Sequence, residues 1–458
     1  MGALDPSSTP EHAGSAGPVS VGYRRYVLGL LVTVYVFNFI DRQILSILVE
    51  SIRRDIGLSD TQIGFLTGIA FAAVYTTAGI PIARLADRSV RRSIIAAGLA
   101  AWSGMTALTG LARSFPELAL ARFGVGLGEA ACSPPAHSLL SDYFPPERRG
   151  TALSIYSLGI PIGVMIGFIA GGWINEIFGW RQAFFAVGVP GLILAVVVRL
   201  TLREPQRGAA DRPTGAPPSP VPAESLGEVL RFMGRLRAFR HMALAAALHA
   251  FYGYGAGAFL APFFIRIHGM SSGEVGTWLG LISGLVGGVG TFLGGTLGDR
   301  LSARHGDARW YMWVPALSTL GSVPFAFFLY LWPEPRTALL LFMPAALAGP
   351  MYLGSTFAMT QGLARPHMRA MAAAILMFVI NMIGLGLGPQ VVGLASDLLA
   401  PRLGVASLRW ALLGVVVPLS LWSALHYLLA ARTLRQELAA SAAANEAGAG
   451  GAGPGGTS

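Results

Sequence analysis

The chain has 458 residues, of which 53% are hydrophobic and only 12% are charged, and its mean hydropathy is +0.58. Soluble domains carry about 25% charged residues, so this composition excludes an ordinary soluble protein. The formal net charge is +10, and because the sequence contains no lysine, all 33 basic residues are arginine. The single cysteine, Cys132, excludes an intrachain disulfide.

Twelve apolar runs follow one another along the chain, each suited to cross a bilayer as a helix of about 20 residues. Residues 1–22 lack the apolar core of a cleavable signal peptide, so the first run is expected to serve as the insertion signal. The sequence therefore predicts an all-α membrane protein with twelve transmembrane helices. These helices are predicted near residues 26–49, 61–85, 93–112, 116–141, 151–174, 182–200, 241–265, 274–298, 310–332, 337–363, 370–396 and 409–430.

A linker rich in proline, glycine and alanine separates the sixth helix from the seventh. We expect two six-helix halves, 23–202 and 241–433, joined by a cytoplasmic linker, 203–240. The N-terminus (1–22) and the tail (434–458) are expected to be disordered because their composition cannot bury a core.

Within the linker, "SLGEVLRFMGRLRAFR" predicts a short amphipathic helix that lies on the membrane surface. Apolar side chains recur there at helical spacing, opposite several arginines. They are Leu226, Val229, Leu230, Met233 and Leu236.

The arginines predict the orientation of the chain. The termini and the even-to-odd loops on their side hold 23 arginines, the opposite loops hold 8, and Arg42 and Arg122 lie within spans. Because basic loops stay on the cytoplasmic side, both termini are predicted to be cytoplasmic. The basicity therefore indicates topology rather than nucleic-acid binding.

Residues 58–88 align with residues 270–300 at a constant offset of 212, without a gap. Gly64 matches Gly276, Gly68 matches Gly280, and each segment ends in an Asp-Arg pair. Two parallel six-helix repeats are the organisation of major facilitator transporters. Chance similarity between glycine-rich helices is the alternative.

Several motifs resemble those of the major facilitator superfamily. "ARLADRSVRR" (83–92) is similar to its loop 2–3 signature, and "RFGVGLG" (122–128) is similar to its fourth-helix motif. "NFIDRQ", "LADRSVRR", "GVGLGEA" and "DYFPPERRG" together resemble the Spinster branch. The resemblance runs from about residue 24 to residue 430. It implies a transporter with a central cavity, and in the characterised animal members the substrates are sphingosine-1-phosphate or lysolipids.

The loop signature implies a gate on the cytoplasmic side. Carboxylate–guanidinium bonds there could hold the two halves together, although the arginines could equally serve topology alone. The candidate gate residues are Asp87, Arg88, Arg91, Arg92, Arg148, Arg149, Asp299 and Arg300.

The resemblance implies that the first and fourth helices lie beside the central cavity, so three charges inside them, at similar depth, are expected to meet: Asp41, Arg122 and Glu129. Arg122 and Glu129 are seven residues apart and so share a helix face. Each unpaired charge would cost about 2.5–3.5 kcal/mol at the bilayer centre, so the three must be paired, protonated or hydrated. Arg42 points about 100° away from Asp41, so it is expected to lie outside this site; its partner is left open between a lipid headgroup, a substrate phosphate and a residue on a neighbouring helix.

One arginine can neutralise only one of the two carboxylates. The other is expected to exchange a proton near neutral pH, because burial and a like-charged neighbour both oppose its ionisation. We assign proton coupling to Asp41 as the main site, Glu129 as its partner and Arg122 as the switch. A static triad that holds the two helices together is the alternative.

Further side chains are candidates for substrate contact. Those for the headgroup are Arg42, Arg122, His249 and Asn381. Those for the cavity wall are Tyr75, Tyr156, Tyr252, Tyr254 and Phe259. For His249, a hydrogen-bonded place in the protein core is the alternative. Gly159, Gly163, Gly167 and Gly171 repeat every four residues, which favours close helix packing.

The prediction is a proton-coupled secondary transporter of a lipid-like substrate that works by alternating access, with no cofactor, metal site, nucleic-acid partner or enzymatic activity. We expect a monomer in a bacterial inner membrane. An exporter of drugs or small organic anions is the first alternative, and a receptor or scaffold without transport is the second.

Overall fold

The computed structural model describes residues 20–208 and 225–450, and in that part of the chain every regular element is helical. The helices of the first half are α1 (Val21–Ile56), α2 (Asp60–Thr67), α3 (Ile69–Arg88), α4 (Arg91–Thr109), α5 (Phe115–Glu129), α6 (Ser133–Tyr143), α7 (Pro146–Ser157), α8 (Gly159–Phe178) and α9 (Trp180–Thr201). The linker forms α10 (Leu226–Arg235).

The second half contains π-helical segments between its α-helices. Its main elements are α11 (Arg237–His268), α12 (Ser272–Leu281), η1 (Ile282–Val286), α13 (Gly287–His305), α14 (Trp310–Leu331), α15 (Pro335–Ala348), α16 (Tyr352–Leu363), α17 (Arg369–Val379), η4 (Ile380–Leu387), α18 (Gly388–Leu403) and α19 (Ser407–Gly450).

These elements make the twelve predicted crossings. In the described chain, nine stretches qualify as membrane spans by length and hydropathy, and one of them, Pro366–Ala443, crosses twice. Helix α4, which begins at Arg91, makes one further crossing. Helices α5 and α6 together make the other, as one crossing interrupted after Glu129. The fold is therefore an all-α membrane bundle of two six-helix halves.

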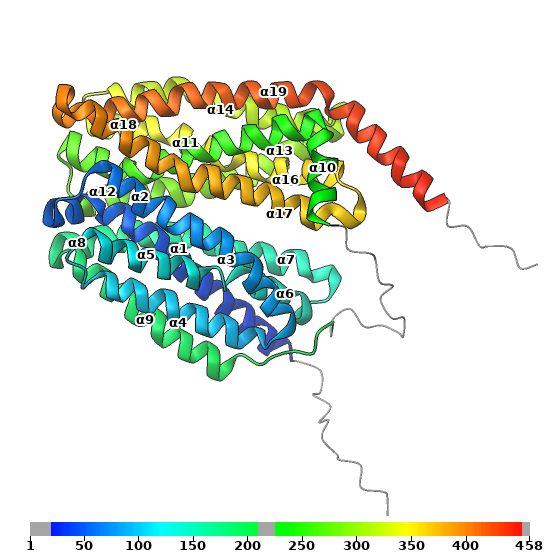
Figure 1. The fold of residues 1–458 in the computed structure, drawn as a ribbon, viewed down its shortest axis with the longest axis horizontal. Coiled ribbons are helices and arrows are strands. Elements are labelled where there is room, and N and C mark those ends of the chain that lie inside the picture. The colour runs from blue at the N-terminus through cyan, green and yellow to red at the C-terminus, as the bar shows by residue number, and fades with distance from the viewer. Residues whose placement is uncertain (1–19, 209–224, 451–458) are drawn as a thin grey trace, which may run out of the picture.

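The two halves lie side by side and meet mainly at one end (Figure 1). We call the end where α1 begins the arginine-rich end, and the other the opposite end. Hydrogen bonds and ion pairs join the halves by connecting residues 50–61 and 172–176 with residues 266–277 and 396–397. All these residues lie at the opposite end, so the halves are closed there.

The four-residue glycine repeat of α8 packs on α1, as predicted. A side chain at Gly163 would come within 2.6 Å of the Val36 carbonyl oxygen, and one at Gly167 would come within 3.2 Å of the Ile40 backbone. Only glycine lets the two helices approach this closely.

Two predictions about the ends of helices need correction. Helix α19 continues to Gly450, so residues 434–450 are not a disordered tail. Their alanine-rich sequence favours a helix by intrinsic propensity. Helix α1 begins at Val21 and ends at Ile56, one to two turns beyond each predicted limit. The predicted disorder of residues 1–19 and 451–458 lies outside the described residues.

The linker helix α10 forms where the sequence predicts it, but part of its apolar face packs on protein. Val229 and Met233 are buried against the second half, whereas Leu226 and Leu230 are 51% and 47% exposed. Ser225 and Glu228 form a capping box at its start. The exposed leucines are the part of this helix that could face a membrane surface.

Candidate functional site

The four intramembrane charges of the first half lie in one buried cluster. Asp41 and Arg42 come from α1, and Arg122 and Glu129 come from α5. Arg42 Nε donates to Glu129 Oε2 at 2.6 Å, and Arg122 lies within electrostatic reach of both carboxylates. The predicted meeting of Asp41, Arg122 and Glu129 thus occurs, with Arg42 as a fourth member.

The position of Arg42 corrects the sequence interpretation. The direction of its Cβ, about 100° away from Asp41, predicts that Arg42 lies outside the site, but the guanidinium bends back to Glu129. The Cζ atom of Arg42 lies over three aromatic rings. It is 5.1 Å from the ring centroid of Phe39, 4.9 Å from that of Phe71 and 4.7 Å from that of Tyr75. The length of an arginine side chain therefore outweighs the direction of its Cβ.

Asp41 is buried without a partner. The residue is 1% exposed, and in the described chain neither carboxylate oxygen has a hydrogen-bond partner. Trp102 and Thr106 of α4 are its nearest polar neighbours. An ionised carboxylate in such a place is very costly, whereas a protonated one is tolerated. Among described residues, no cation bonds to the Asp41 carboxylate.

Arg122 connects the cluster to another helix instead of bonding to a carboxylate. Its Nε donates to the Leu66 carbonyl oxygen at 3.3 Å, and its guanidinium lies 5.2 Å from the Phe71 ring centroid. Leu66 is near the end of α2, where Gly68 interrupts the helix and carbonyl groups lack helical partners.

His249 packs inside the second half, as the core alternative requires. The residue is 3% exposed, and its ring nitrogens bond to the Gly349 carbonyl oxygen at 2.8 Å and the Tyr252 hydroxyl at 2.8 Å. Thr319 is a third polar neighbour at 3.4 Å. These contacts occupy both ring nitrogens, so His249 is not free to bind a headgroup in this state.

The predicted cavity residues differ in exposure. Tyr156 and Phe259 are fully buried in side-chain packing, so they do not face an open space here. Tyr254 is 41% exposed and lies near Arg42 and Tyr75 across the boundary between the halves. Asn381 lies in the π-helical segment η4, which packs on α11 and α3; such segments are frequent at functional sites.

Two candidate gate residues at the arginine-rich end, Arg91 and Asp299, make contacts within their own halves. Arg91 is 1% exposed and bonds to Glu204 at 2.7 Å and to Asp142 at 2.5 Å. Asp299 accepts from Tyr311 at 2.7 Å. The side chain of Asp87 lies outside the described residues. In this state Arg91 and Asp299 each stabilise their own half.

Replacing Arg91 is expected to destabilise the first half. Arg91→Gln leaves Glu204 and Asp142 without their buried cation, which typically costs about 3–5 kcal/mol of unfolding free energy. Arg88→Gln, at an exposed position, should change the unfolding free energy by less than about 0.5 kcal/mol. Thermal unfolding in detergent compares the two, and equal melting temperatures would mean that Arg91 serves topology alone.

An ion cluster that the sequence did not reveal closes the opposite end. Arg266 of α11 donates to both carboxylate oxygens of Asp60, at 2.7 and 2.8 Å, and to Glu50 at 2.9 Å. The side chains of Arg266, Asp60 and Glu50 are 9%, 6% and 1% exposed. Ser396 and Asp397 of α18 complete the cluster through the Asp60 side chain and the α2 backbone.

Glycines of the internal repeat allow the same end to close. A side chain at Gly64 would overlap the Pro389 carbonyl oxygen of α18, and one at the matching Gly276 would overlap the Phe168 carbonyl oxygen of α8. Each half thus uses the same repeat position to approach the other. We call this arrangement, together with the Arg266 cluster, the outer gate.

A side chain at Gly276 is expected to hold the outer gate open. Gly276→Val places carbon atoms against the α8 backbone, which cannot move without separating α12 from α8. Gly295→Val is the control, because nothing lies within 4 Å of a Cβ atom at Gly295. Substrate uptake should be lost only in Gly276→Val, and equal uptake by both variants would contradict this role.

Comparison with known proteins identifies the family. The model of the Major Facilitator Superfamily matches residues 31–389. The chain belongs to the major facilitator superfamily. An "MFS-type efflux pump" of Mycolicibacterium smegmatis is 34% identical over 441 residues, which are 96% of this chain and 99% of that protein. Human "Protein spinster homolog 1" is 30% identical over 325 residues, 68% of this chain and 60% of that protein.

A solved structure places this major facilitator protein beside the Spinster branch and confirms that predicted resemblance. The crystal structure of a bacterial homolog to the human lysosomal transporter Spinster, inward-facing and unoccupied, superposes with a TM-score of 0.81. It is 33% identical and covers 92% of this chain and 99% of its own. The predicted two-half architecture and the internal repeat agree with this family.

Sequence reasoning missed Glu50, Asp60 and Arg266 as gate residues of this family member. They lie at helix ends, where charges are ordinary, and of the three only Arg266 enters the sequence analysis, as one of the arginines that predict topology. One signal was available: two acids and one arginine border the glycine-matched segments that begin at residues 58 and 270.

Proposed function

We propose that this protein is a proton-coupled secondary active transporter of an amphiphilic, lipid-like substrate with an anionic or zwitterionic headgroup, of the sphingosine-1-phosphate or lysophospholipid type. It works by alternating access, the two halves rocking about the central cavity. The observation that carries the proposal is the buried Asp41 carboxylate without a partner, next to the Arg42–Glu129 ion pair.

The proton step follows from the contacts of Arg122. With Asp41 neutral, Arg122 stays on the Leu66 carbonyl oxygen and helps to hold α2 in the closed outer gate. When Asp41 loses its proton, the new carboxylate attracts Arg122, because two opposite charges in a poorly hydrated site interact strongly. Arg122 then leaves α2, and the outer gate loosens. Glu129 stays paired with Arg42 throughout.

Arg42 is the candidate headgroup ligand. Its Nε is occupied by Glu129, but 22% of the side chain remains exposed. The exposed edge can bind an anionic headgroup, and the rings of Phe39, Phe71 and Tyr75 form an apolar wall beside it. A cation next to aromatic surface suits a molecule with a charged head and a hydrocarbon tail.

The proposal includes the orientation and the state of assembly. Both termini face the cytoplasm of a bacterium, supported by the 23 arginines on their side. The closed outer gate is then the extracellular one, which agrees with the similarity to an inward-facing structure. Transport needs no second copy of the chain, because both gates lie within one chain.

A second candidate is proton-driven export of drugs or small organic anions. The efflux-pump name of the Mycolicibacterium smegmatis relative, which matches over 99% of its length, favours it. The two candidates share the proton step and differ in the substrate.

Uptake into proteoliposomes under an imposed pH gradient tests the proposal. The probes are a labelled lysophospholipid, a labelled sphingoid phosphate and a labelled small organic anion. We expect uptake of the two lipids that is driven by the pH gradient, and no uptake of the small organic anion. Uptake of the anion alone would favour the second candidate, and uptake of neither lipid by folded protein would contradict the proposal.

A further inference from the structure

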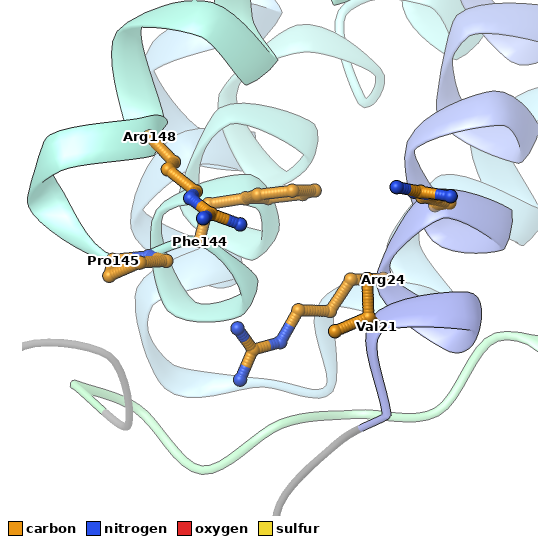
Figure 2. A pocket seen from close by; sticks show the side chains of 6 residues that line it. Val21, Arg24, Phe144, Pro145 and Arg148 are labelled. Carbon is orange, nitrogen blue, oxygen red and sulfur yellow. The ribbon is translucent and has the colours of Figure 1, made fainter.

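A small pocket lies at the arginine-rich end of the first half, far from the charged cluster. It is formed between the start of α1 and the loop that leads from α6 to α7 (Figure 2). Its volume is about 90 Å³, and its lining residues are Val21, Arg24, Arg25, Phe144, Pro145 and Arg148. Arg25 and Arg42 are 17 positions apart, which is about 25 Å along a helix, so this pocket is separate from the transport site.

The pocket holds three arginines and no acid. Figure 2 shows the guanidinium groups of Arg24 and Arg148 directed into the space between α1 and α7. Among described residues, no carboxylate forms an ion pair with Arg24, Arg25 or Arg148. In addition, the Nε of Arg24 is buried and lacks a hydrogen-bond acceptor. A buried donor without an acceptor is costly, and an anion in the pocket would supply the acceptor.

A fully buried arginine at this end, Arg91, is balanced by acids, because it bonds to Glu204 and Asp142 in the same half. In the pocket, by contrast, the buried Nε of Arg24 has no acceptor among the described residues. The guanidinium groups of Arg24 and Arg148, which are directed into one space, and Arg25 in the same lining suit an oxyanion such as phosphate, which accepts several charge-assisted hydrogen bonds.

The size and depth of the pocket point to a phosphate group. Its 90 Å³ is about three times the volume of a water molecule in the liquid, about 30 Å³. This admits a compact anion and excludes the body of an amphiphile. Arg24 and Arg25 directly precede the apolar run of α1 that begins at Tyr26, which is the level at which phospholipid headgroups meet a transmembrane helix.

We propose that Arg24, Arg25 and Arg148 form an anion site that binds a phosphate group at the arginine-rich end of α1. The phosphate belongs either to a membrane phospholipid or to a free phosphate compound, and the chemistry of recognition is the same. Because all three arginines come from the first half, the bound anion ties α1 to the α6–α7 loop within that half. The site does not depend on which substrate is transported.

Thermal unfolding of the purified full chain in detergent tests the site with two probes at equal ionic strength. One probe is inorganic phosphate, and the other is short-chain phosphatidylglycerol; chloride is the reference salt. A ligand that binds only the folded state raises its stability with concentration. We expect at least one probe to raise the melting temperature above the chloride value.

Variants assign that shift to the pocket. Arg148→Gln removes an exposed side chain and should weaken the affinity about tenfold or more, the effect of losing one hydrogen bond between charged groups. Arg24→Gln together with Arg148→Gln should abolish the shift, whereas Arg304→Gln, exposed at the same end, should retain it. If the double variant does not fold, Arg148→Gln alone decides.

The two probes separate the sources of the anion. Stabilisation by phosphatidylglycerol alone identifies a lipid headgroup site, and stabilisation by both identifies a site for the phosphate group itself. The proposal is overturned if neither probe stabilises the native chain more than chloride does. It is also overturned if Arg148→Gln responds as strongly as the native chain.

Discussion

Asp41→Asn is expected to abolish transport that is driven by a pH gradient. Asparagine has nearly the shape of a protonated aspartate but cannot release a proton. The variant should therefore fold, keep Arg122 on Leu66 and remain in the state with a closed outer gate. Accumulation of the labelled lipid in proteoliposomes should fall to the level of protein-free vesicles.

Glu147→Gln is the matched control for this prediction. Glu147 is exposed near the start of α7 and takes no part in the charged cluster. Its variant should accumulate the lipid as the native protein does. Unchanged accumulation by Asp41→Asn would reduce Asp41 to a structural charge, and a loss of folding in that variant would support the static-triad alternative.

Arg266→Gln is expected to open the outer gate. The substitution leaves Asp60 and part of the charge of Glu50 without a cation in a buried place, at a cost of about 3–5 kcal/mol. This cost applies only to the state with a closed outer gate, because the carboxylates of Asp60 and Glu50 become hydrated when the halves separate. At about 1.4 kcal/mol per factor of ten, the equilibrium should shift by roughly two to more than three orders of magnitude.

Distances between spin labels measure this shift. Leu111 and Val405 are 58% and 62% exposed in loops of the two halves at the opposite end. Cysteine-attached labels at these positions should move apart in Arg266→Gln. The control is Arg181→Gln, because Arg181 pairs with Asp55 within one half and both are well exposed, and exposed ion pairs contribute about 1 kcal/mol or less. An unchanged distance between the labels in Arg266→Gln would show that the Arg266 cluster does not keep the outer gate closed.

The sequence sufficed for the helices and the repeat because both are local patterns. Apolar runs predict the membrane-spanning helices, and the constant offset between residues 58–88 and 270–300 predicts two repeated halves. The meeting of Asp41 with Glu129 could also be predicted, since depth along a helix follows from residue number and the family resemblance implies that the first and fourth helices lie beside the cavity.

The pairing of side chains across helices could not be predicted. Arg42 reaches Glu129 because its long side chain bends around the aromatic rings, which helical direction alone does not reveal. Arg266 meets Asp60 and Glu50 only because of how the two halves meet, and nothing local to residue 266 records that contact. The repeat glycines were visible, but their contacts with the other half were not.

The central claim is that substrate and proton move together through one protein. Its most direct test is a record of lumenal pH in proteoliposomes, with no imposed gradient, as lysophospholipid is added outside. We predict a change in lumenal pH that requires the substrate, is absent with Asp41→Asn and persists with Glu147→Gln. Lipid movement by the native protein without any change in lumenal pH would contradict the account.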